Sequence, residues 1–593
     1  MTLTNVQLNR LSHVCSVTDF GAQGDGTTDD TVAIQAAITT GKNVAFPPGK
    51  YKVTSTLTIP SGNTGQIIYS LNGYTSYPTS RLGANAEIYF DKADITTEYA
   101  NESWKDAVPC FLVNASGVSF QGLWIECVEN SPSDKRNQIG VKTAVTAVGY
   151  TDDADTKFDN CQFRNWGFAI YHIGRGVEVT GCLINSSTTG VLLDWPSSGI
   201  GPDDGSVPLA TDDDYANRGT RIQDNRFHGV KAAVWHIGSF PLVGALITGN
   251  HLDIGTGLFW VGKNVDGSGG QETRDTLISN NVVTFSGRSS NIIQYSRETK
   301  SIRDHITNNH FVGGINEDAG ERTPYNLIYF RSCHTITDLT ISNNYFGYAL
   351  RHGILFANED SESAAVVDGV NIHDNTFVAW GFVDDGTRAT RGGIAMEINS
   401  TNLSIRNNTF KNTYSTNECI RFSSTTQTNL YMDGNTFTAG ALYTPTNVTV
   451  SGNKFDATYS SGTFTPILAN LNQPDHSSPQ IAYNSQTGSY IKIGQLVHIW
   501  INIQFNSLDT SDTSGFTIGG LPFTHDVDEA IIGLNSLGST GIGNKETILG
   551  AVFSENTNLT LTDGTGDNNS FLYSESGVAS GIVALAFSYK ANY

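Results

Sequence analysis

A short pattern recurs along the middle of this 593-residue chain: an apolar residue, then Asn, usually three residues later, then an apolar close. Successive copies lie 18 to 35 residues apart, which is the period of a solenoid. Cys161 and Cys182 also fall in repeat positions, and we expect them to be small buried core residues. The repeated Asn residues are Asn225, Asn250, Asn281, Asn309, Asn344, Asn375, Asn408, Asn435 and Asn453.

Each copy is too short for a βαβ unit and is rich in the strand formers Ile, Val, Phe and Thr. We therefore predict that each copy forms one coil of a β-helix. We expect each Asn to adopt a left-handed backbone conformation and to hydrogen-bond the Asn of the next coil, which satisfies a column of buried amides. The alternative is that the Asn pairs mark hairpin turns in a β-sandwich, but hairpins would not repeat one motif at this period.

A second apolar strand lies between successive Asn motifs. Its second and third positions are mostly aliphatic, as stacked coils that bury a common core require. Differences in coil length should then fall in loops at one or two edges, where binding and chemistry are expected. The strands are 167–172, 190–195, 232–237, 257–262, 291–296, 326–331, 353–358, 392–398 and 418–423, and the largest loops are 196–219, 263–276, 312–325, 359–368 and 380–392.

The segment 16–38 predicts a cap for the open end of this solenoid. Asp29 or Asp30 can cap a short helix, and the apolar residues of that helix would cover the first coil, as a terminal repeat must. These apolar residues are Val32, Ile34 and Ile38.

The run DFGAQGDGTTDDTVAIQAAI, followed by FPPGKY, resembles the N-terminal cap of the pectate-lyase-like superfamily, in the form found in bacteriophage tailspikes and capsule depolymerases. Residues 496–505, LVHIWINIQF, alternate as antiparallel strands do. Together with TFTP, GSYIKIGQLV and GGLPF, they are similar to a C-terminal module of phage tail fibres and tailspikes. For this module the resemblance implies trimer assembly, with carbohydrate binding as a further candidate role.

The predicted fold class is all-β: a right-handed parallel β-helix with an N-terminal cap helix and a C-terminal β-sandwich. We expect a short virion-attachment peptide at 1–15, the cap at 16–53, a catalytic β-helix at 54–462 and the sandwich at 463–593. The resemblance implies a homotrimeric tailspike of the phage virion, joined through its N-terminus to an adaptor or tail protein. It would act extracellularly as an endo-glycosidase on capsular polysaccharide or O-antigen.

Charge excludes some partner classes. A net charge of −22 argues against nucleic acid and anionic membranes. Acidic glycans are not excluded, because basic residues such as Arg297, Arg303, Arg322 and Arg331 can bind them locally. The seven Cys have irregular spacing and give no disulfide framework, and no cluster has the spacing of a structural metal site, so we expect no metal and no cofactor.

Hydrolysis of a glycosidic bond takes two carboxylates, about 5–5.5 Å apart for retention and roughly 6.5–9.5 Å apart for inversion. Coils stack at about 4.8 Å, so matched carboxylates on neighbouring coils can form either pair. Glu359 and Asp360, with Glu397 in the next coil, are the first choice for acid and base. Glu298 and Asp194 are the next candidates for the catalytic carboxylates. The alternative for each is a solvated turn or strand carboxylate.

Sugar rings stack their C–H faces on aromatic side chains. The motifs place Trp235, Trp260, Tyr329 and Phe356 at one position of successive strands, with Gln294 between them. This column is a sugar-binding stripe if it faces outward and core if it faces inward, and both options stay open.

Two other functions are compatible with the sequence. In the adjacent columns, His236 and Tyr295 could serve a polysaccharide lyase as base, while Arg331 neutralises a uronic carboxylate. A non-catalytic adhesin that only holds the glycan would show an outward aromatic stripe without paired carboxylates.

Overall fold

The computed structural model forms two compact units, one comprising Met1–Leu442 with Thr446–Asn453 and the other Tyr443–Pro445 with Lys454–Tyr593. No helix among the described residues is long and apolar enough to cross a membrane. The described residues are 13–72, 85–91, 108–128, 138–144, 155–174, 176–194, 217–238, 241–255, 257–262, 271–284, 291–313, 326–358, 366–381, 391–411, 418–423, 427–438, 444–446, 450–451, 459–470, 481–493, 496–508, 516–522, 532–540, 550–555, 558–562 and 581–590.

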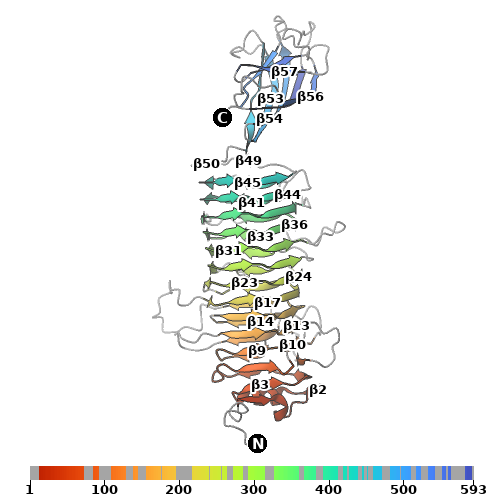
Figure 1. The fold of residues 1–593 in the computed structure, drawn as a ribbon, viewed down its shortest axis with the longest axis vertical. Helices are drawn as coiled ribbons and strands as arrows, with labels where there is room; N and C mark the ends of the chain where they lie inside the picture. The colour runs from red at the N-terminus through yellow and green to blue at the C-terminus, as the bar shows by residue number, and fades with distance from the viewer. Residues whose placement is uncertain are drawn as a thin grey trace, which may run out of the picture. The chain divides into compact units, whose positions relative to one another are not determined.

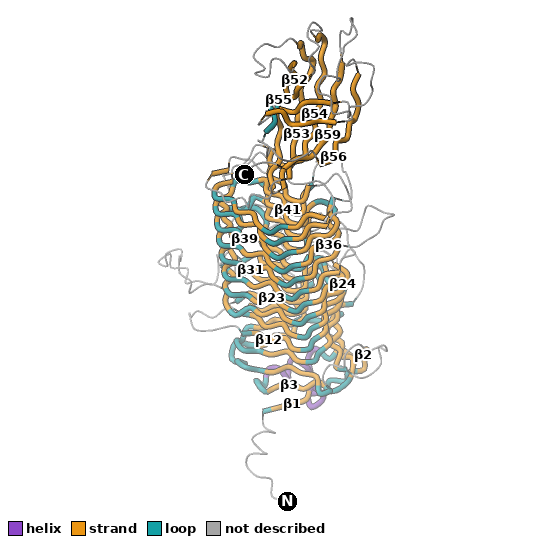
Figure 2. Tube along the Cα trace, turned by 45° about the horizontal axis from the view of Figure 1, so that its top comes forward, coloured by secondary structure: helices purple, strands orange, loops and turns teal. Residues whose placement is uncertain are grey.

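The first unit is a parallel β-helix, which confirms the predicted fold class (Figure 1). One coil shows the path: β23 (Leu246–Thr248) lies in sheet A, β24 (His251–Gly255) in sheet B, β25 (Phe259–Val261) in sheet C and β26 (Glu272–Arg274) in sheet D. The chain then re-enters sheet A as β27 (Leu277–Ser279), which pairs in parallel with β23. Figure 2 shows the loops that join the strands stacked in columns along the coils.

The four sheets run along the solenoid. Sheet A extends from β1 (Val14–Ser16) to β47 (Tyr431–Asp433), sheet B from β2 (Asp25–Asp29) to β48 (Thr436–Thr438) and sheet D from β18 (Asn217–Arg218) to β50 (Val450–Ser451). Sheet C contains β5 (Leu57–Ile59), β8 (Pro109–Val113), β11 (Ile139–Ala144), β14 (Phe168–Ile173), β17 (Thr189–Asp194), β21 (Ala232–His236), β25, β29 (Ile293–Tyr295), β33 (Asn326–Arg331), β37 (His352–Ala357), β41 (Gly392–Glu397), β45 (Glu418–Ser423) and β49 (Thr444–Thr446).

Coil length varies at the two edges of sheet C. From β9 (Ser119–Gln121) onward, the turn from sheet A to sheet B keeps two residues between strands, as at Gly249 and Asn250. By contrast, two residues separate β36 (Tyr345–Ala349) from β37, whereas thirteen separate β32 (His310–Val312) from β33. All the largest loops predicted from the sequence precede or follow a strand of sheet C, although most of their residues lie outside the described part of the chain.

A column of Asn amides runs through the turn between sheets A and B, as predicted. Asn281 illustrates the unit: its backbone N–H and its Nδ2 both donate to Oδ1 of Asn309, each at 3.0 Å, and its Nδ2 also donates to the Ile247 carbonyl at 2.8 Å. The same bonds link Asn225 through to Asn435, while Asn453 lies outside the described residues.

The left-handed residue, however, is not the ladder Asn. It is the exposed residue just before it, such as Asn280 with φ 56° or Asn308 with φ 57°. The ladder Asn instead points its amide inward, where every donor finds a carbonyl of a neighbouring coil. The repeat in the sequence identified the column of Asn residues correctly. It placed the left-handed backbone conformation one residue too late.

The interior is filled by stacked rows of equivalent side chains. Tyr295, Phe330 and Phe356 form one such row, with ring centroids 4.9 Å and then 4.6 Å apart. Because the coil repeat of about 4.8 Å matches an aromatic stacking distance, identical residues can occupy one row without leaving a void.

The N-terminal cap is helix α2 (Thr31–Thr39), whose Ile34, Ala37 and Ile38 are buried. Val32 was predicted to share this face but is 81% exposed, because it lies off the i, i+3, i+4 stripe that the other three residues form. Asp30 is the N-cap residue, yet its carboxylate accepts from the backbone N–H groups of Gln23 and Gly24 at 2.7 and 3.0 Å.

The second unit contains two antiparallel sheets, as the sandwich prediction requires. Sheet E has the strand order β51 (Tyr459–Phe464), β53 (Ile481–Ile493), β54 (Leu496–Leu508), β59 (Gly581–Lys590), β56 (Ile532–Thr540). Sheet F has the order β52 (Ile467–Asn470), β55 (Phe516–Gly519), β58 (Asn558–Thr562), β57 (Gly550–Glu555).

All seven cysteines are free and buried. Cys161 and Cys182 continue the Asn ladder toward the N-terminus: the Cys182 N–H donates to Oδ1 of Asn225 at 2.9 Å, and the Cys161 N–H contacts Sγ of Cys182 at 3.3 Å.

Candidate functional site

The outer face of sheet C carries a continuous row of side chains that the strand register lines up. Side chains alternate across a strand, and the rows on either side of this one are buried in the interior, so this row faces outward. In order along the solenoid its members are Lys142, Tyr171, Leu192, Trp235, Trp260, Gln294, Tyr329, Leu355, Ala395 and Arg421.

Two tryptophans occupy the middle of this row. Trp235 and Trp260 meet edge to face, with ring centroids 6.3 Å apart. The indole N–H of Trp235 donates to the Gly262 carbonyl at 2.9 Å, and that of Trp260 donates to the Asn291 carbonyl at 3.0 Å. Both rings are therefore fixed in orientation by the backbone, and Trp235 remains only half-buried.

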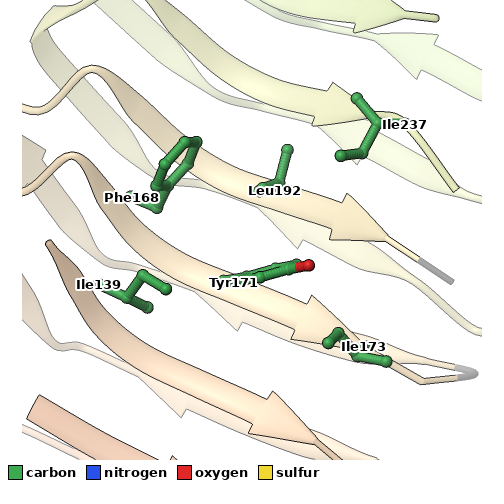
Figure 3. Packing of buried hydrophobic residues seen from close by; sticks show 6 residues of the cluster. All are labelled: Ile139, Phe168, Tyr171, Ile173, Leu192 and Ile237. Carbon is green, nitrogen blue, oxygen red and sulfur yellow. The ribbon is translucent and has the colours of Figure 1, made fainter. Parts of the chain in front are cut away.

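An apolar cluster extends the row toward the N-terminus. Figure 3 shows its members side by side on one face of neighbouring strands: Ile139, Phe168, Tyr171, Ile173, Leu192 and Ile237. Trp235 packs against this cluster. The Tyr171 hydroxyl donates to Oδ2 of Asp194 at 2.6 Å, and the Lys142 ammonium lies 5.1 Å from the Tyr171 ring centroid.

A second apolar cluster lies on the same face farther along the solenoid. Tyr329, Leu355, Ala357 and Ala395 are all at most 7% exposed. Charged residues border it at the strand ends: Ala357 pairs in register with Arg331 on one side and with Glu397 on the other. Arg331 is exposed and Glu397 is half-buried. With two strand spacings between them, their backbones lie about 10 Å apart.

The register corrects one member of the predicted stripe. Phe356 pairs with Phe330 and lies in the interior row, whereas the partner of Tyr329 in the outer row is Leu355. The motif 353–358 begins one residue after the register partner of the motif 326–331, and a shift of one residue moves a side chain to the opposite face. Trp235, Trp260, Gln294 and Tyr329 do share one row, and that row faces outward.

His236 and Tyr295 lie in the interior row instead. Both are at most 1% exposed, and the Tyr295 hydroxyl donates to Oδ2 of the buried Asp304 at 3.1 Å. Burial lowers the pKa of His236 to about 4 and raises the pKa of Tyr295 well above its usual range. The fold therefore does not bring either side chain to the outer face, where a base acting on a glycan would be needed.

The candidate carboxylates do not all belong to one place. Asp194, at the end of β17, and Glu397, at the end of β41, are separated by six strand spacings, or roughly 29 Å. Glu298 lies in the turn after β29, where its backbone has φ 61° and its N–H donates to the Ser332 carbonyl at 3.0 Å. Glu359 and Asp360 lie outside the described residues, directly after the segment that follows β37.

Within the described part of the chain, no group of three or more His, Cys, Asp and Glu side chains could hold a metal ion.

Comparison with known families gives a match over part of the chain. Residues 14–201 match the family model described as rhamnogalacturonase A/epimerase, pectate lyase-like. This segment of the β-helix is therefore similar to the pectate-lyase-like family. Among curated proteins it is similar to a tail spike protein of an Escherichia phage, with 37% identity over 82 residues, and to a glucan 1,3-beta-glucosidase of Cochliobolus carbonum, with 43% identity over 68 residues. These matches cover 14% and 10% of this chain, and the chain spans about a tenth of the length of either relative.

Several solved structures match the chain at low identity. The Dettilon tailspike protein matches with a TM-score of 0.43 and 16% identity, covering 100% of this chain and 97% of its own. A tailspike protein of E. coli bacteriophage HK620 in complex with a pentasaccharide gives 0.35 and 11%, covering 98% and 94%. The Streptococcus pneumoniae adhesin PfbA gives 0.29 and 14%, covering 74% and 99%.

Several residues of the outer row of sheet C were not found from the sequence. Tyr171, Leu355 and Ala395 belong to this row, and so do Lys142 and Arg421. The signal that could have found them is the alternation within each strand of sheet C, counted from its fully buried residues.

Proposed function

We propose that this chain is a phage tailspike depolymerase that binds a bacterial surface polysaccharide along the outer face of sheet C and cleaves it by hydrolysis. The observation that carries the proposal is the outward row that contains Tyr171, Trp235, Trp260 and Tyr329. The match to a phage tail spike protein supports this assignment, and so does the match to a glucosidase. As such a spike, the protein would be a homotrimer of the virion that acts outside the host cell and is joined to the particle through an adaptor or tail protein.

The row suits an extended chain of sugars. Tyr171 and Tyr329 are separated by five strand spacings, or roughly 24 Å, which exceeds a single sugar ring. The half-buried Trp235 can take the C–H face of a sugar ring. The half-buried Gln294 offers an amide for sugar hydroxyls between Trp260 and Tyr329, which are both 7% exposed. Loops flank both edges of this sheet, where they can add contacts specific to one glycan.

For the chemistry, Glu397 is the described carboxylate best placed to act. It ends β41 at the border of the apolar cluster formed by Tyr329, Leu355, Ala357 and Ala395. Glu359 and Asp360 follow β37, the neighbouring strand of sheet C, so one of them can supply the second carboxylate. A general acid and a base on adjacent coils match the separations that glycosidases use. Asp194 and Glu298 remain candidates for contacts elsewhere along the row.

A polysaccharide lyase is the second candidate, and Arg331 favours it. This exposed arginine lies two strands from Glu397 on the outer face, where it could neutralise a uronic carboxylate while a carboxylate or hydroxyl removes the neighbouring proton.

The test applies purified protein to lawns of many encapsulated or smooth Gram-negative strains, with mass spectrometry of the soluble products. Translucent halos with oligosaccharides of a fixed repeat mass are the expected result. Hydrated products would mark hydrolysis, and products about 18 Da lighter that absorb near 232 nm would mark the lyase. Strain-specific binding without halos or oligosaccharides would contradict cleavage and favour an adhesin.

A further inference from the structure

A second column of buried polar side chains lies at the corner between sheets B and C, distinct from the Asn ladder between sheets A and B. The backbone N–H and Nδ2 of Asn326 both donate to Oδ1 of Asn291, at 3.1 and 3.2 Å. The His352 N–H donates to Oδ1 of Asn326 at 3.3 Å, and Nδ1 of His352 accepts from the Gly392 N–H at 3.0 Å. This column lies next to the outer row of sheet C, because Asn291 comes just before β29, the strand that carries Gln294.

Asn291 contacts two side chains of the outer row. Its backbone carbonyl accepts from the indole N–H of Trp260 at 3.0 Å, and its Nδ2 donates to Oε1 of Gln294 at 2.9 Å. Nε2 of Gln294 in turn donates to Oγ of Ser296 at 3.0 Å. Gln294 is half-buried and lies in the row between Trp260 and Tyr329. The Gln294 amide is therefore held by a residue before it and a residue after it in the chain.

The direction of these hydrogen bonds follows from one backbone group. The Asn326 N–H can only donate, so the Asn291 side-chain atom that it meets is the oxygen. Nδ2 of Asn291 then faces Gln294, and because Nδ2 can only donate, the Gln294 atom beside it is also an oxygen. The Ser296 hydroxyl can donate or accept, so it takes the Nε2 that remains. Asn291 thus sets which way the Gln294 amide points.

We infer that Asn291 positions Gln294 to recognise two neighbouring hydroxyls of a neutral sugar residue. A primary amide has two donor hydrogens and two lone pairs, and Asn291 and Ser296 use one of each. One N–H and one lone pair are left for a ligand. Two hydroxyls can satisfy both, since one accepts from the N–H and the other donates to the oxygen. A carboxylate can only accept, so it would leave the Gln294 oxygen facing another oxygen.

This inference rests on the proposed binding of a polysaccharide to sheet C, and it names the class of sugar at one position along that face. Sites built to hydrogen-bond a substrate hydroxyl reject ligands that lack it, because the buried polar groups are then left unpaired. Arg331 lies on the next strand, two residues after Tyr329, the register partner of Gln294. A uronate of the same glycan can pair with Arg331 while a neutral residue lies on Gln294.

Neutron diffraction from deuterium-exchanged crystals of the full-length protein tests the orientation without any ligand. We expect deuterium on the Gln294 side-chain atom that faces Ser296 and none on the atom that faces Asn291. In Asn291→Asp the side chain can no longer donate, so the Gln294 amide should turn and place Nε2 toward position 291. Deuterium on the atom facing Asn291 in the parent, or an unturned amide in Asn291→Asp, would overturn the inference.

Kinetics on the purified surface polysaccharide of a responsive strain test the consequence for recognition. Asn291→Asp should raise KM about tenfold with kcat nearly unchanged, because Trp260 is held by the backbone carbonyl of Asn291 and stays in place. In a Gln294→Leu background the same substitution should have no further effect on KM, since the amide that it turns is gone. Where the polysaccharide is bound without cleavage, Kd replaces KM.

Asn343→Asp is the matched control, because it makes the same chemical change at an exposed residue in the turn between sheets A and B. Its KM should equal that of the parent. A further rise of KM in the Gln294→Leu background would overturn the positioning role, and a polysaccharide made only of uronates would overturn the neutral class. If no strain yields a polysaccharide that is bound or cleaved, the proposed function fails and the sugar class with it, whereas the neutron result still decides whether Asn291 orients Gln294.

Discussion

Single side chains hold the coils in register. In each ladder Asn, the backbone N–H and Nδ2 both donate to the side-chain oxygen of the next Asn. Nδ2 also donates to a backbone carbonyl, and all three bonds lie inside the core. Repetition in the sequence was sufficient to locate this column, because Asn recurs at every ladder position from Asn225 to Asn435, where each buried amide pairs with the next. The left-handed residue before it was missed, since Asn, Asp and Gly all serve there and leave a less uniform pattern.

Replacing one ladder residue should therefore be costly. Asn309→Ala removes the acceptor of the Asn281 N–H and Nδ2 and leaves the Asn344 oxygen with one donor fewer. We expect a loss of roughly 1–3 kcal/mol in the free energy of unfolding, since buried donors remain unpaired. Asn280→Gly is the control: Asn280 is exposed with φ 56°, and Gly249 and Gly434 already fill this place in other coils. Equal thermal stability of the two variants would contradict the role of the ladder.

Glu397 is the residue on which the proposed chemistry depends most. Glu397→Gln keeps the shape but removes the charge and the proton exchange, so cleavage should fall by at least about a hundredfold while folding and glycan binding persist. Glu178→Gln is the control, because Glu178 is a half-buried carboxylate on sheet A that pairs with Lys157 at 3.2 Å. Release of oligosaccharides is the readout. Full activity of Glu397→Gln would move the catalytic assignment to the carboxylates of other coils.

At the scale of elements, the side chains of sheet C alternate between the interior of the solenoid and its outer face. Its strands were predicted from the aliphatic motifs, and their order follows from the repeat. What the sequence left open was the direction in which the aromatic row faces, because outward positions such as Leu192 and Leu355 are also apolar. Loops of sheet C have no periodicity, so the placement of Glu359 and Asp360 could not be derived from repetition at all.

The outward row predicts a selective effect on binding. Trp235→Leu should preserve packing, because Leu192 occupies the preceding place in the same row, but it removes an aromatic face. We expect KM to rise about tenfold with kcat nearly unchanged. Tyr345→Leu removes an aromatic ring from the outer row of sheet B, where Tyr345 stacks on His310 at 4.6 Å, and should leave KM unchanged. A higher KM for Tyr345→Leu together with an unchanged KM for Trp235→Leu would place the glycan on sheet B.

The interior row of sheet C predicts a dependence on pH. Burial lowers the pKa of His236 to about 4 from 6.5, so the unfolded chain binds more protons between these values. The stability contributed by neutral His236 is present above pH 6.5 and is lost as the pH falls toward 4, by at most about 3 kcal/mol.

His236→Leu should flatten this decline, since Leu193 is its neighbour in the row. Midpoints of thermal unfolding between pH 4 and pH 7 measure the effect. His305→Leu, at an exposed position beside Leu277, should keep the slope of the parent. An unchanged slope in His236→Leu would show that other groups govern the acid response.

At the scale of the whole molecule, the chain forms two compact units. The coils carry the long outer face that we propose for a polysaccharide, and the second unit contains two antiparallel sheets. The order of these parts was predicted from the cap motif and from the alternating strands near the C-terminus.

The proposed tailspike assembly predicts a particle of three chains. Light scattering of the purified protein should give three times the mass of one chain, independent of concentration over the micromolar range. A mass equal to a single chain would contradict the trimer and, with it, the proposed attachment to a virion as a spike.

The interior position of every thiol has a consequence for where such a protein can be made and used. Since all seven sulfurs are free and shielded, no covalent bond has to form or break when the chain passes from a reducing cytosol to oxidising surroundings. The same native state is complete in both, so synthesis inside one cell and work outside another need no redox step between them.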